Sequence, residues 1–140
     1  MKNLIKLENI SHTLRKSIFK TVCKRGGHLS TAYSAVEILV SLYFTDLLNI
    51  NLKNYKNKDR NFFLLSKGHG ETLLYAVLVE KKIISENQFR NHYRSGSHVL
   101  GGHVDIKTPG IEITSGALGH GLSIGCGIAL GNKLLKSKKN

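Results

Sequence analysis

The sequence is poor in residues that cross-link or stiffen a chain: its 140 residues include two cysteines, one proline and no tryptophan. Cys23 and Cys126 lie far apart and fit neither a CxxC motif nor a Cys/His metal-ligand spacing, which excludes a disulfide-rich or zinc-finger class. No apolar run approaches the roughly 18 residues of a membrane-spanning helix, and the N-terminal stretch lacks the apolar core of a secretory signal. These absences predict a reduced, cytoplasmic protein.

Acidic residues are also scarce, since nine of them face 21 lysines and arginines and the formal net charge is +12. Such an excess is typical of proteins that bind nucleic acids, phosphates or other anions. The lysines are scattered, however, with small clusters only at "KNYKNKDR" and "KLLKSKK". Neither cluster interleaves aromatic residues as a stacking platform for single strands would. The charge therefore leaves two interpretations open, an anion-binding protein or a lysine-rich solvated surface.

Helical periodicity dominates the first third of the chain. Apolar residues recur every four positions and predict an amphipathic helix over residues 10–24, ended by the glycine pair 26–27. A second helix is expected from residue 30 or 34 to residue 48. Ser34 and Glu37 have the spacing of a capping box at its start.

Two short apolar runs, "NFFLLS" (61–66) and "IEITS" (111–115), predict strands buried on both faces. Helical patterns follow them over residues 67–82 and from residue 117 onward. A short helix capped by Ser85 and Gln88 lies between. Alternating strands and helices in one domain predict an α/β layer architecture.

The last predicted helix contains Gly121, Gly125, Gly127 and Gly131. Glycine disfavours a helix by about 1 kcal/mol per residue. Several glycines in one helix therefore predict close packing of its backbone against a neighbouring element or a ligand.

Four of the seven histidines directly follow a glycine: His28, His69, His103 and His120. In "NFFLLSKGHGETLLY" and "EITSGALGHGLS" a predicted strand leads through a glycine turn into a helix. Ligands of open α/β sheets bind at such strand ends, where free backbone N–H groups receive phosphate oxygens. One such loop alone is more simply a tight turn. Two loops together with two further Gly-His pairs favour a ligand site.

These segments resemble the N-terminal, cofactor-binding half of the transketolases, over about residues 12–135. The resemblance is carried, in order, by "GGHLSTAYSAVEILVSLYF", "DRNFFLLSKGHGETLLYAVL" and "GGHVDIKTPGIEITSGALGHGLSIGCGIALG". The related deoxyxylulose-phosphate synthases normally have Val-Gly-His-Gln where this chain has Lys-Gly-His-Gly. The chain therefore resembles the transketolases more than these synthases. Its segment "GALGHGLSIG" and its short loops are most similar to the N-terminal subunit of a transketolase that is split into two chains.

The resemblance implies an α/β, three-layer thiamine diphosphate-binding fold, in which helices flank a parallel sheet. Residues 1–140 would form a single domain, truncated and so incomplete at the C-terminus. The implied activity is transfer of a two-carbon ketol unit from a ketose phosphate to an aldose phosphate, as in the pentose phosphate pathway. The implied cofactors are thiamine diphosphate and Mg²⁺ or Ca²⁺. The family's Gly-Asp-Gly metal motif and its later asparagine are absent, so metal ligands are expected only beyond residue 140.

The resemblance also assigns roles to residues. His28 would be a proton-transfer partner near the reacting substrate oxygens, and His103 would face the C1 hydroxyl of the donor, so both are expected to be catalytic. His69 would hydrogen-bond the cofactor diphosphate. Gly116 and Leu118 would line the cofactor, with Leu118 against the thiazolium ring.

Other polar residues receive weaker assignments. His120 stands where the family often has glutamine and is interpreted as structural. Asp59 and Arg60 are expected to form a local ion pair of little energetic value. Glu71 and Asp105 could act as acid or base, although nothing in the sequence pairs them.

The partners implied are sugar phosphates and a C-terminal transketolase half, fused or separate, in a homodimer or heterotetramer, with no membrane and no specific nucleic acid. The chain alone is therefore expected to be inactive. Two alternatives remain. One is a deoxyxylulose-phosphate-synthase-like enzyme that takes pyruvate as donor. The other is a non-enzymatic basic binding or assembly module, whose nucleic-acid binding would depend steeply on salt.

Overall fold

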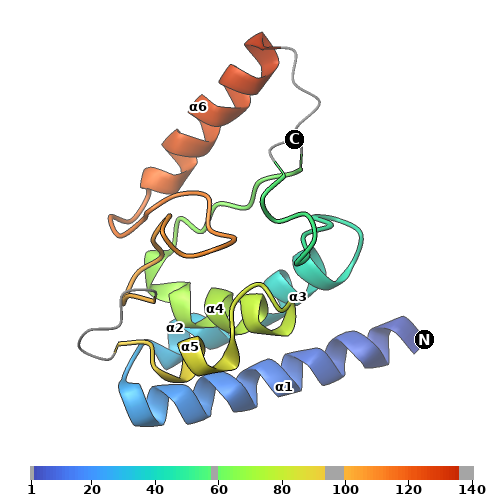
Figure 1. The fold of residues 1–140 in the computed structure, drawn as a ribbon, viewed down its shortest axis with the longest axis vertical. Coiled ribbons are helices and arrows are strands. Elements are labelled where there is room, and N and C mark those ends of the chain that lie inside the picture. The colour runs from blue at the N-terminus through green and yellow to red at the C-terminus, as the bar shows by residue number, and fades with distance from the viewer. Residues whose placement is uncertain (1, 58–59, 94–99, 136–140) are drawn as a thin grey trace.

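The computed structural model describes residues 2–57, 60–93 and 100–135 (Figure 1). This part of the chain is helical and contains no strand. Its elements are α1 (Lys2–Arg25), α2 (Leu29–Tyr33), α3 (Val36–Phe44), the 3₁₀ helix η1 (Gly68–Gly70), α4 (Glu71–Glu80), α5 (Glu86–Arg90) and α6 (His120–Leu134). Helices α1 to α5 pack together, whereas α6 extends away from them (Figure 1).

Helix α4 lies at the centre of the packed helices. All residues from Glu71 to Leu78 are buried, because the sequence "TLLYAVL" places apolar side chains on every side of the helix. The helices α1, α2, α3 and α5 all contact it. Its N-terminus, and η1 directly before it, are therefore held in a fixed position.

The predicted first helix is confirmed at its C-terminal end. Leu14 and Ile18 lie on its buried face, 1% and 0% exposed. The helix ends before Gly26 and Gly27, whose φ angles of +84° and +128° are left-handed and suit glycine. It begins earlier than predicted, at Lys2, with several turns whose apolar side chains are mostly exposed.

The predicted second helix is divided, and its capping box is wrong. Ser34 ends α2 instead of opening a helix. Its hydroxyl donates to the carbonyl oxygen of Thr31 (3.0 Å) and accepts from Lys67 Nζ (2.9 Å). Glu37 forms a bidentate ion pair with Arg15 across α1 and α3. Both side chains thus have partners that the local spacing did not reveal.

The second predicted capping box is confirmed. The Ser85 hydroxyl accepts from the backbone N–H of Gln88, and the Gln88 side chain accepts from the backbone N–H of Ser85. Helix α5 therefore begins where the sequence places it.

The two predicted strands do not form a sheet within the described residues. The segments 61–66 and 111–115 lie beside each other, but the bond that joins them comes from a side chain: Ser115 Oγ donates to the carbonyl oxygen of Leu65 (2.7 Å). The Ser115 N–H donates elsewhere, to Val104 O (3.1 Å). A β-ladder needs repeated exchange of backbone N–H and C=O groups, so the parallel sheet stays a prediction.

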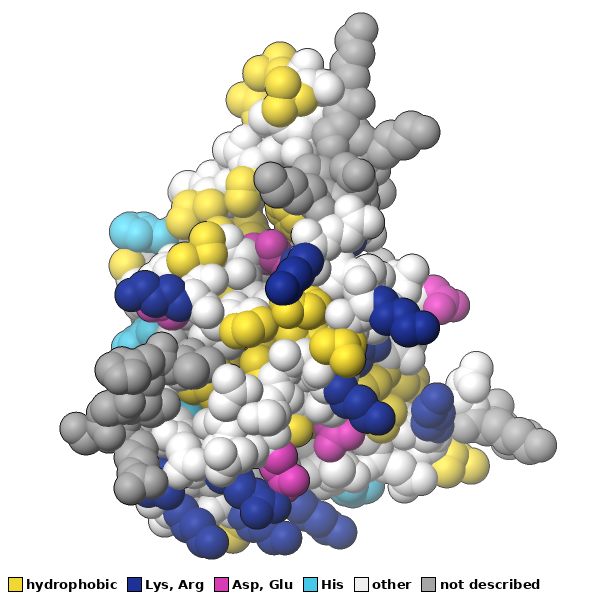
Figure 2. Space-filling model, viewed as in Figure 1, with side chains coloured by type: hydrophobic (Ala, Val, Ile, Leu, Met, Phe, Trp, Pro, Cys, Tyr) yellow, Lys and Arg dark blue, Asp and Glu magenta, His cyan; other side chains and the backbone are white. Residues whose placement is uncertain are grey.

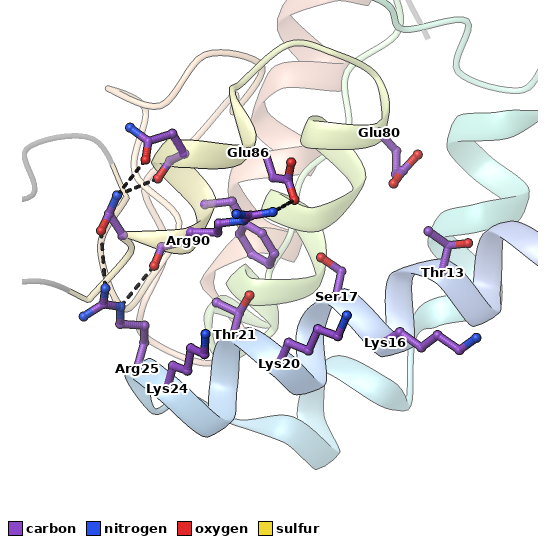
Figure 3. Close-up of a pocket in the computed structure, with 13 residues that line it drawn as sticks. Thr13, Lys16, Ser17, Lys20, Thr21, Lys24, Arg25, Glu80, Glu86 and Arg90 are labelled. Atoms are coloured by element: carbon purple, nitrogen blue, oxygen red, sulfur yellow. Dashed lines mark hydrogen bonds and ion pairs between the residues drawn. The ribbon is translucent and has the colours of Figure 1, made fainter.

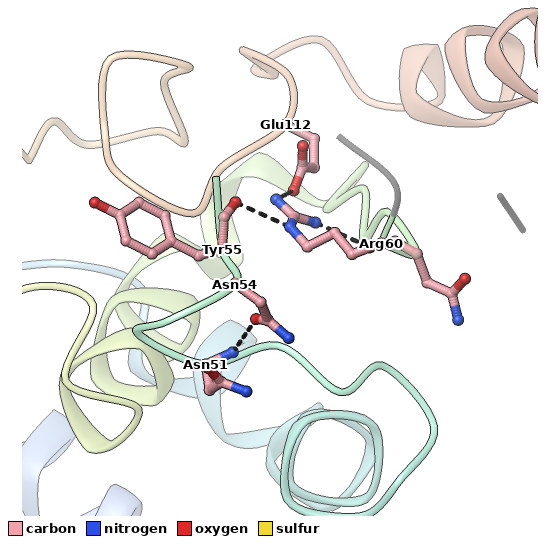
Figure 4. A network of polar contacts seen from close by, with 6 residues as sticks. Asn51, Asn54, Tyr55, Arg60 and Glu112 are labelled. Carbon is pink, nitrogen blue, oxygen red and sulfur yellow. Dashed lines mark hydrogen bonds and ion pairs between the residues drawn. The ribbon is translucent and has the colours of Figure 1, made fainter. Parts of the chain in front are cut away.

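Arg60 has a partner within the described residues that the sequence did not suggest. Asp59 lies outside the described residues, and Arg60 pairs with Glu112, 52 positions away (Figure 4). Its guanidinium also donates to the carbonyl oxygens of Tyr55 and Asn61, each at 2.9 Å. Burial raises the pKa of Glu112, and the bond from Arg60 acts against that rise. The pair fastens the segment 111–115 to the loop before the segment 61–66.

Helix α6 is almost entirely exposed, with Gly121 its one buried residue. Hydrophobic side chains lie on the surface over this helix (Figure 2), and Leu122 and Leu134 are 75% and 74% exposed. The contact at its start is close: the Gly121 N–H donates to Ser66 Oγ at 3.1 Å. None of the helices in the described ranges has the length and apolar content to cross a membrane.

Alanine substitutions at two glycines of α6 should separate the effect of close packing on stability from the effect of helix propensity. A Cβ at residue 121 would lie 2.4 Å from Ser66 Cβ and 2.6 Å from its Cα, whereas one at residue 127 would meet nothing within 4 Å. We expect Gly121→Ala to lower the free energy of unfolding in urea by about 1–3 kcal/mol. Gly127→Ala should raise it by about 1 kcal/mol. Equal effects of the two substitutions would contradict this packing.

Candidate functional site

Three histidines from separate parts of the chain meet at one place. The rings of His28 and His69 pack edge to face with centroids 4.8 Å apart, and those of His69 and His103 with centroids 4.7 Å apart. We call these three side chains the histidine cluster. The sequence singled out all three, and the structure brings them together.

His69 is the central member of the cluster and is carried by η1. The backbone there is tightly turned, with the Gly70 N–H donating to Lys67 O at 2.8 Å. A Cβ at Gly68 would lie 2.9 Å from Ser115 O and 3.2 Å from His103 Cδ2. Glycine at residue 68 therefore allows the segment that ends at Ser115, and the His103 ring, to approach η1.

His28 occupies the turn between α1 and α2. It directly follows the left-handed glycine pair 26–27 and is the N-cap residue of α2, where its carbonyl accepts from the Ala32 N–H at 3.0 Å. Its side chain is exposed. The end of α1 therefore fixes the backbone from which this imidazole reaches His69.

His103 is held through its backbone. The Tyr75 hydroxyl lies 3.0 Å from the His103 carbonyl oxygen and 3.2 Å from that of Gly101. Burial raises the pKa of the Tyr75 phenol, so this group remains a donor at neutral pH. Gly116 lies beside the ring, because a Cβ there would be 3.6 Å from His103 Cδ2.

The sequence model for the family described as "Transketolase, thiamine diphosphate binding domain" matches residues 8–140. The chain belongs to the transketolase family. It is 42% identical to one of the subunits of the apulose-4-phosphate transketolase of Actinobacillus succinogenes, over 81% of this chain and 41% of that protein. It is 36% identical to the 6-deoxy-6-sulfo-D-fructose transketolase subunit SqwG of a Clostridium species, over 90% of this chain and 46% of that protein.

The fold resembles that of a solved transketolase. The structure matches transketolase from Leishmania mexicana with a TM-score of 0.78 and 28% identity, over 88% of this chain and 18% of that one. This likeness is consistent with a thiamine diphosphate-binding fold. The chain spans less than half the length of the two curated transketolase subunits.

The other residues that the sequence singled out have separate surroundings. Leu118 is 70% exposed, and His120 is the exposed first residue of α6. Among the described residues, no ring contact joins His120 to the cluster. Asp105 accepts from the Lys107 N–H (2.9 Å) within its own turn. Glu71 is buried, and its Oε1 accepts from the Thr72 hydroxyl (2.9 Å), whereas its Oε2 has no hydrogen-bond partner among the described residues.

The sequence did not point to Lys67 or Tyr75. Lys67 Nζ donates to Ser34 Oγ (2.9 Å) and Thr31 O (3.3 Å), which ties η1 to α2. The position of this lysine directly before Gly-His-Gly could have indicated in the sequence that it anchors η1. Tyr75 offers no comparable signal, because its partners are backbone carbonyls more than 25 residues away.

Apart from the histidine cluster, the structure has a groove of about 860 Å³ between α1 and α5, and several lysines and arginines line it (Figure 3). Lys16, Lys20 and Lys24 line it on successive turns of α1. Arg25 and Arg90 line it too, but Arg25 donates to the Arg90 carbonyl and Arg90 pairs with Glu86. No residue of the histidine cluster lines this groove. In this transketolase-family chain it is therefore a basic surface separate from the candidate site.

His92, which carries no predicted role, is buried next to the site. It is 0% exposed, stacks on Phe89 with centroids 5.7 Å apart and meets the Tyr93 ring edge to face at 4.5 Å. Neither ring nitrogen has a hydrogen-bond partner among the described residues. Burial lowers its pKa from 6.5 to about 4, so His92 is neutral in the folded protein at neutral pH.

His92 should make the fold sensitive to mild acid. Between pH 6.5 and about 4 the unfolded chain binds a proton at this residue that the folded chain does not. Stability should therefore fall by up to about 3 kcal/mol across this window as the pH is lowered. We expect His92→Phe to remove this loss in urea titrations at several pH values, whereas His12→Phe at an exposed site keeps it. An unchanged pH slope in His92→Phe would refute the assignment.

Proposed function

We propose that this chain is the thiamine diphosphate-binding part of a transketolase. The complete enzyme transfers a two-carbon ketol unit from a ketose phosphate to an aldose phosphate. The observation that carries the proposal is the meeting of three glycine-flanked histidines at the start of the buried helix α4. On this proposal the chain forms a single domain that covers only part of the enzyme and is inactive alone.

The donor groups at the cluster fit the diphosphate of this cofactor. A neutral imidazole always carries one N–H donor, and no carboxylate is bonded to the three rings in the described structure. Gly116 lies beside the His103 ring, and a Cβ at Gly119, three residues further along the chain, would meet nothing within 4 Å. When bound, thiamine diphosphate supplies the nucleophilic carbon and the electron sink of the reaction.

Each site residue has a task on this proposal. His69, fixed by η1, donates to a diphosphate oxygen. His103 holds the C1 hydroxyl of the donor, and His28 moves a proton at the reacting substrate oxygens, because imidazole both donates and accepts near neutral pH. Gly116 leaves room for the cofactor. Leu118 offers an exposed apolar surface to the thiazolium ring.

On this proposal, the metal ligands and the second half of the enzyme are supplied by parts other than the described residues. Within the described residues there is no group of three or more His, Cys, Asp or Glu side chains that could hold a metal ion. We propose that the ligands of the expected Mg²⁺ or Ca²⁺ come from other parts of the enzyme. Two of the relatives are named as transketolase subunits, which supports a partner that supplies the second half of the enzyme. We place the assembled enzyme, a dimer or heterotetramer, in cytoplasmic carbohydrate metabolism.

Ketol transfer tests the proposal when the chain is assayed alone and after assembly with the complementary transketolase half. We expect no turnover by the chain alone, and turnover of a ketose phosphate but not of pyruvate by the assembly. His28→Ala and His103→Ala should each lower kcat/KM by about 10²–10⁴-fold. His69→Ala should raise the Kd for thiamine diphosphate at least about tenfold.

His12→Ala serves as the matched control, because His12 is an exposed histidine on α1. It should leave both kcat/KM and cofactor affinity unchanged. Turnover by the chain alone would overturn the partner requirement. Equal losses in the His12 and cluster variants would overturn the assignment of the site.

A further inference from the structure

The two outer members of the cluster each follow a pair of glycines, and one aromatic ring lies against the second glycine of both pairs. A Cβ at Gly102, directly before His103, would lie 2.6 Å from Tyr93 Cε1 and 3.1 Å from its Cζ. A Cβ at Gly27, directly before His28, would lie 3.8 Å from Tyr93 Cε2. The Tyr93 ring therefore separates the backbones that carry His28 and His103.

The third member of the cluster is connected to the same ring. Glu71 follows His69 by two residues and is 0% exposed. The Tyr93 hydroxyl donates to Glu71 Oε1 at 2.8 Å and lies 3.2 Å from the carbonyl oxygen of Gly102. The Thr72 hydroxyl also donates to Glu71 Oε1, at 2.9 Å. The start of α4 thus holds the tip of the ring.

The backbone of Tyr93 is unusual. Its φ of +60° is left-handed, a conformation that non-glycine residues rarely adopt and that persists where surrounding contacts enforce it. The residue is also 37% exposed, whereas the neighbouring Tyr75 is 0% exposed. Filling the core is therefore a poor explanation for this ring, and its contacts with the two glycine pairs are a better one.

We propose that Tyr93 is a positioning residue: anchored by Glu71, its ring sets the distance between the Gly27–His28 and Gly102–His103 segments and so places both imidazoles against His69. The geometric part of this inference stands on its own. Its consequence for catalysis rests on the proposed function. The contact with the Tyr93 ring also explains the glycine at residue 102. The φ of this glycine is not left-handed, so glycine is required there only for space.

The first test uses the purified chain with isotope-labelled histidine and reads the ring resonances of His28 and His103. Tyr93→Ala should shift both, and His12 should stay in place. Tyr93→Phe keeps the ring and loses the bond to Glu71, so it should give smaller shifts of the same two resonances. Tyr33→Phe is the matched control, because its hydroxyl donates to the Arg15 carbonyl oxygen (2.8 Å) and it should move neither.

A suppression experiment tests the contact at Gly102. Gly102→Ala should lower kcat/KM of the assembled enzyme by about tenfold to a hundredfold, since its Cβ enters the space of the Tyr93 ring. Gly101→Ala in the same loop should not, because its Cβ would approach no atom closer than 3.6 Å. Combining Gly102→Ala with Tyr93→Ala should cost no more than Tyr93→Ala alone.

The outcomes separate the inference from the proposed function. Unshifted His28 and His103 resonances in Tyr93→Ala, or fully additive losses in the double variant, would overturn the positioning role. If Tyr93→Ala does not fold, the shifts in Tyr93→Phe and the contrast between Gly101→Ala and Gly102→Ala still decide it. A wild-type assembly without ketol transfer would overturn the proposed function and leave the resonance test valid.

Discussion

The site depends on the burial of helix α4, whose residues from Glu71 to Leu78 are all buried and which contacts four other helices. Burial of such a helix removes its freedom to rotate or slide. The residues at its N-terminus are therefore held in a fixed position as well. His69 lies in η1 directly before it, and Glu71 is its first residue, so the centre of the site and the anchor of Tyr93 share one fixed support.

The two other histidine loops are exposed segments that have to be brought to this support. Different contacts position each of them: the left-handed glycine pair at the end of α1 turns the chain so that His28 reaches His69, and the Tyr75 hydroxyl holds the carbonyls around His103. Glycine is needed at residues 68 and 102 because other parts of the chain occupy the space of a side chain. The Gly-His pairs thus reflect close approach between loops as well as room for a ligand.

Local features of the sequence were predictable where neighbours in the chain decide them. The end of α1 and the Ser85 capping box are of this kind, and the Gly-His pairs with the family resemblance identified the histidine cluster. The capping role of Ser34 was predicted wrongly and the Arg60–Glu112 pair was not foreseen, because the partners Lys67 and Glu112 lie 33 and 52 positions away. Tyr75 and Tyr93 were missed for the same reason, since they act on distant carbonyls and glycines.

The candidate site exists only if three loops bring His28, His69 and His103 into contact. Ring-to-ring nuclear Overhauser effects in the purified, histidine-labelled chain measure this most directly. The account predicts cross-peaks between His28 and His69 and between His69 and His103, whose ring centroids are 4.8 and 4.7 Å apart, and none from His12 to any of them. Absence of cross-peaks from His69 to both partners would mean that the loops do not meet, and the site would have to be abandoned.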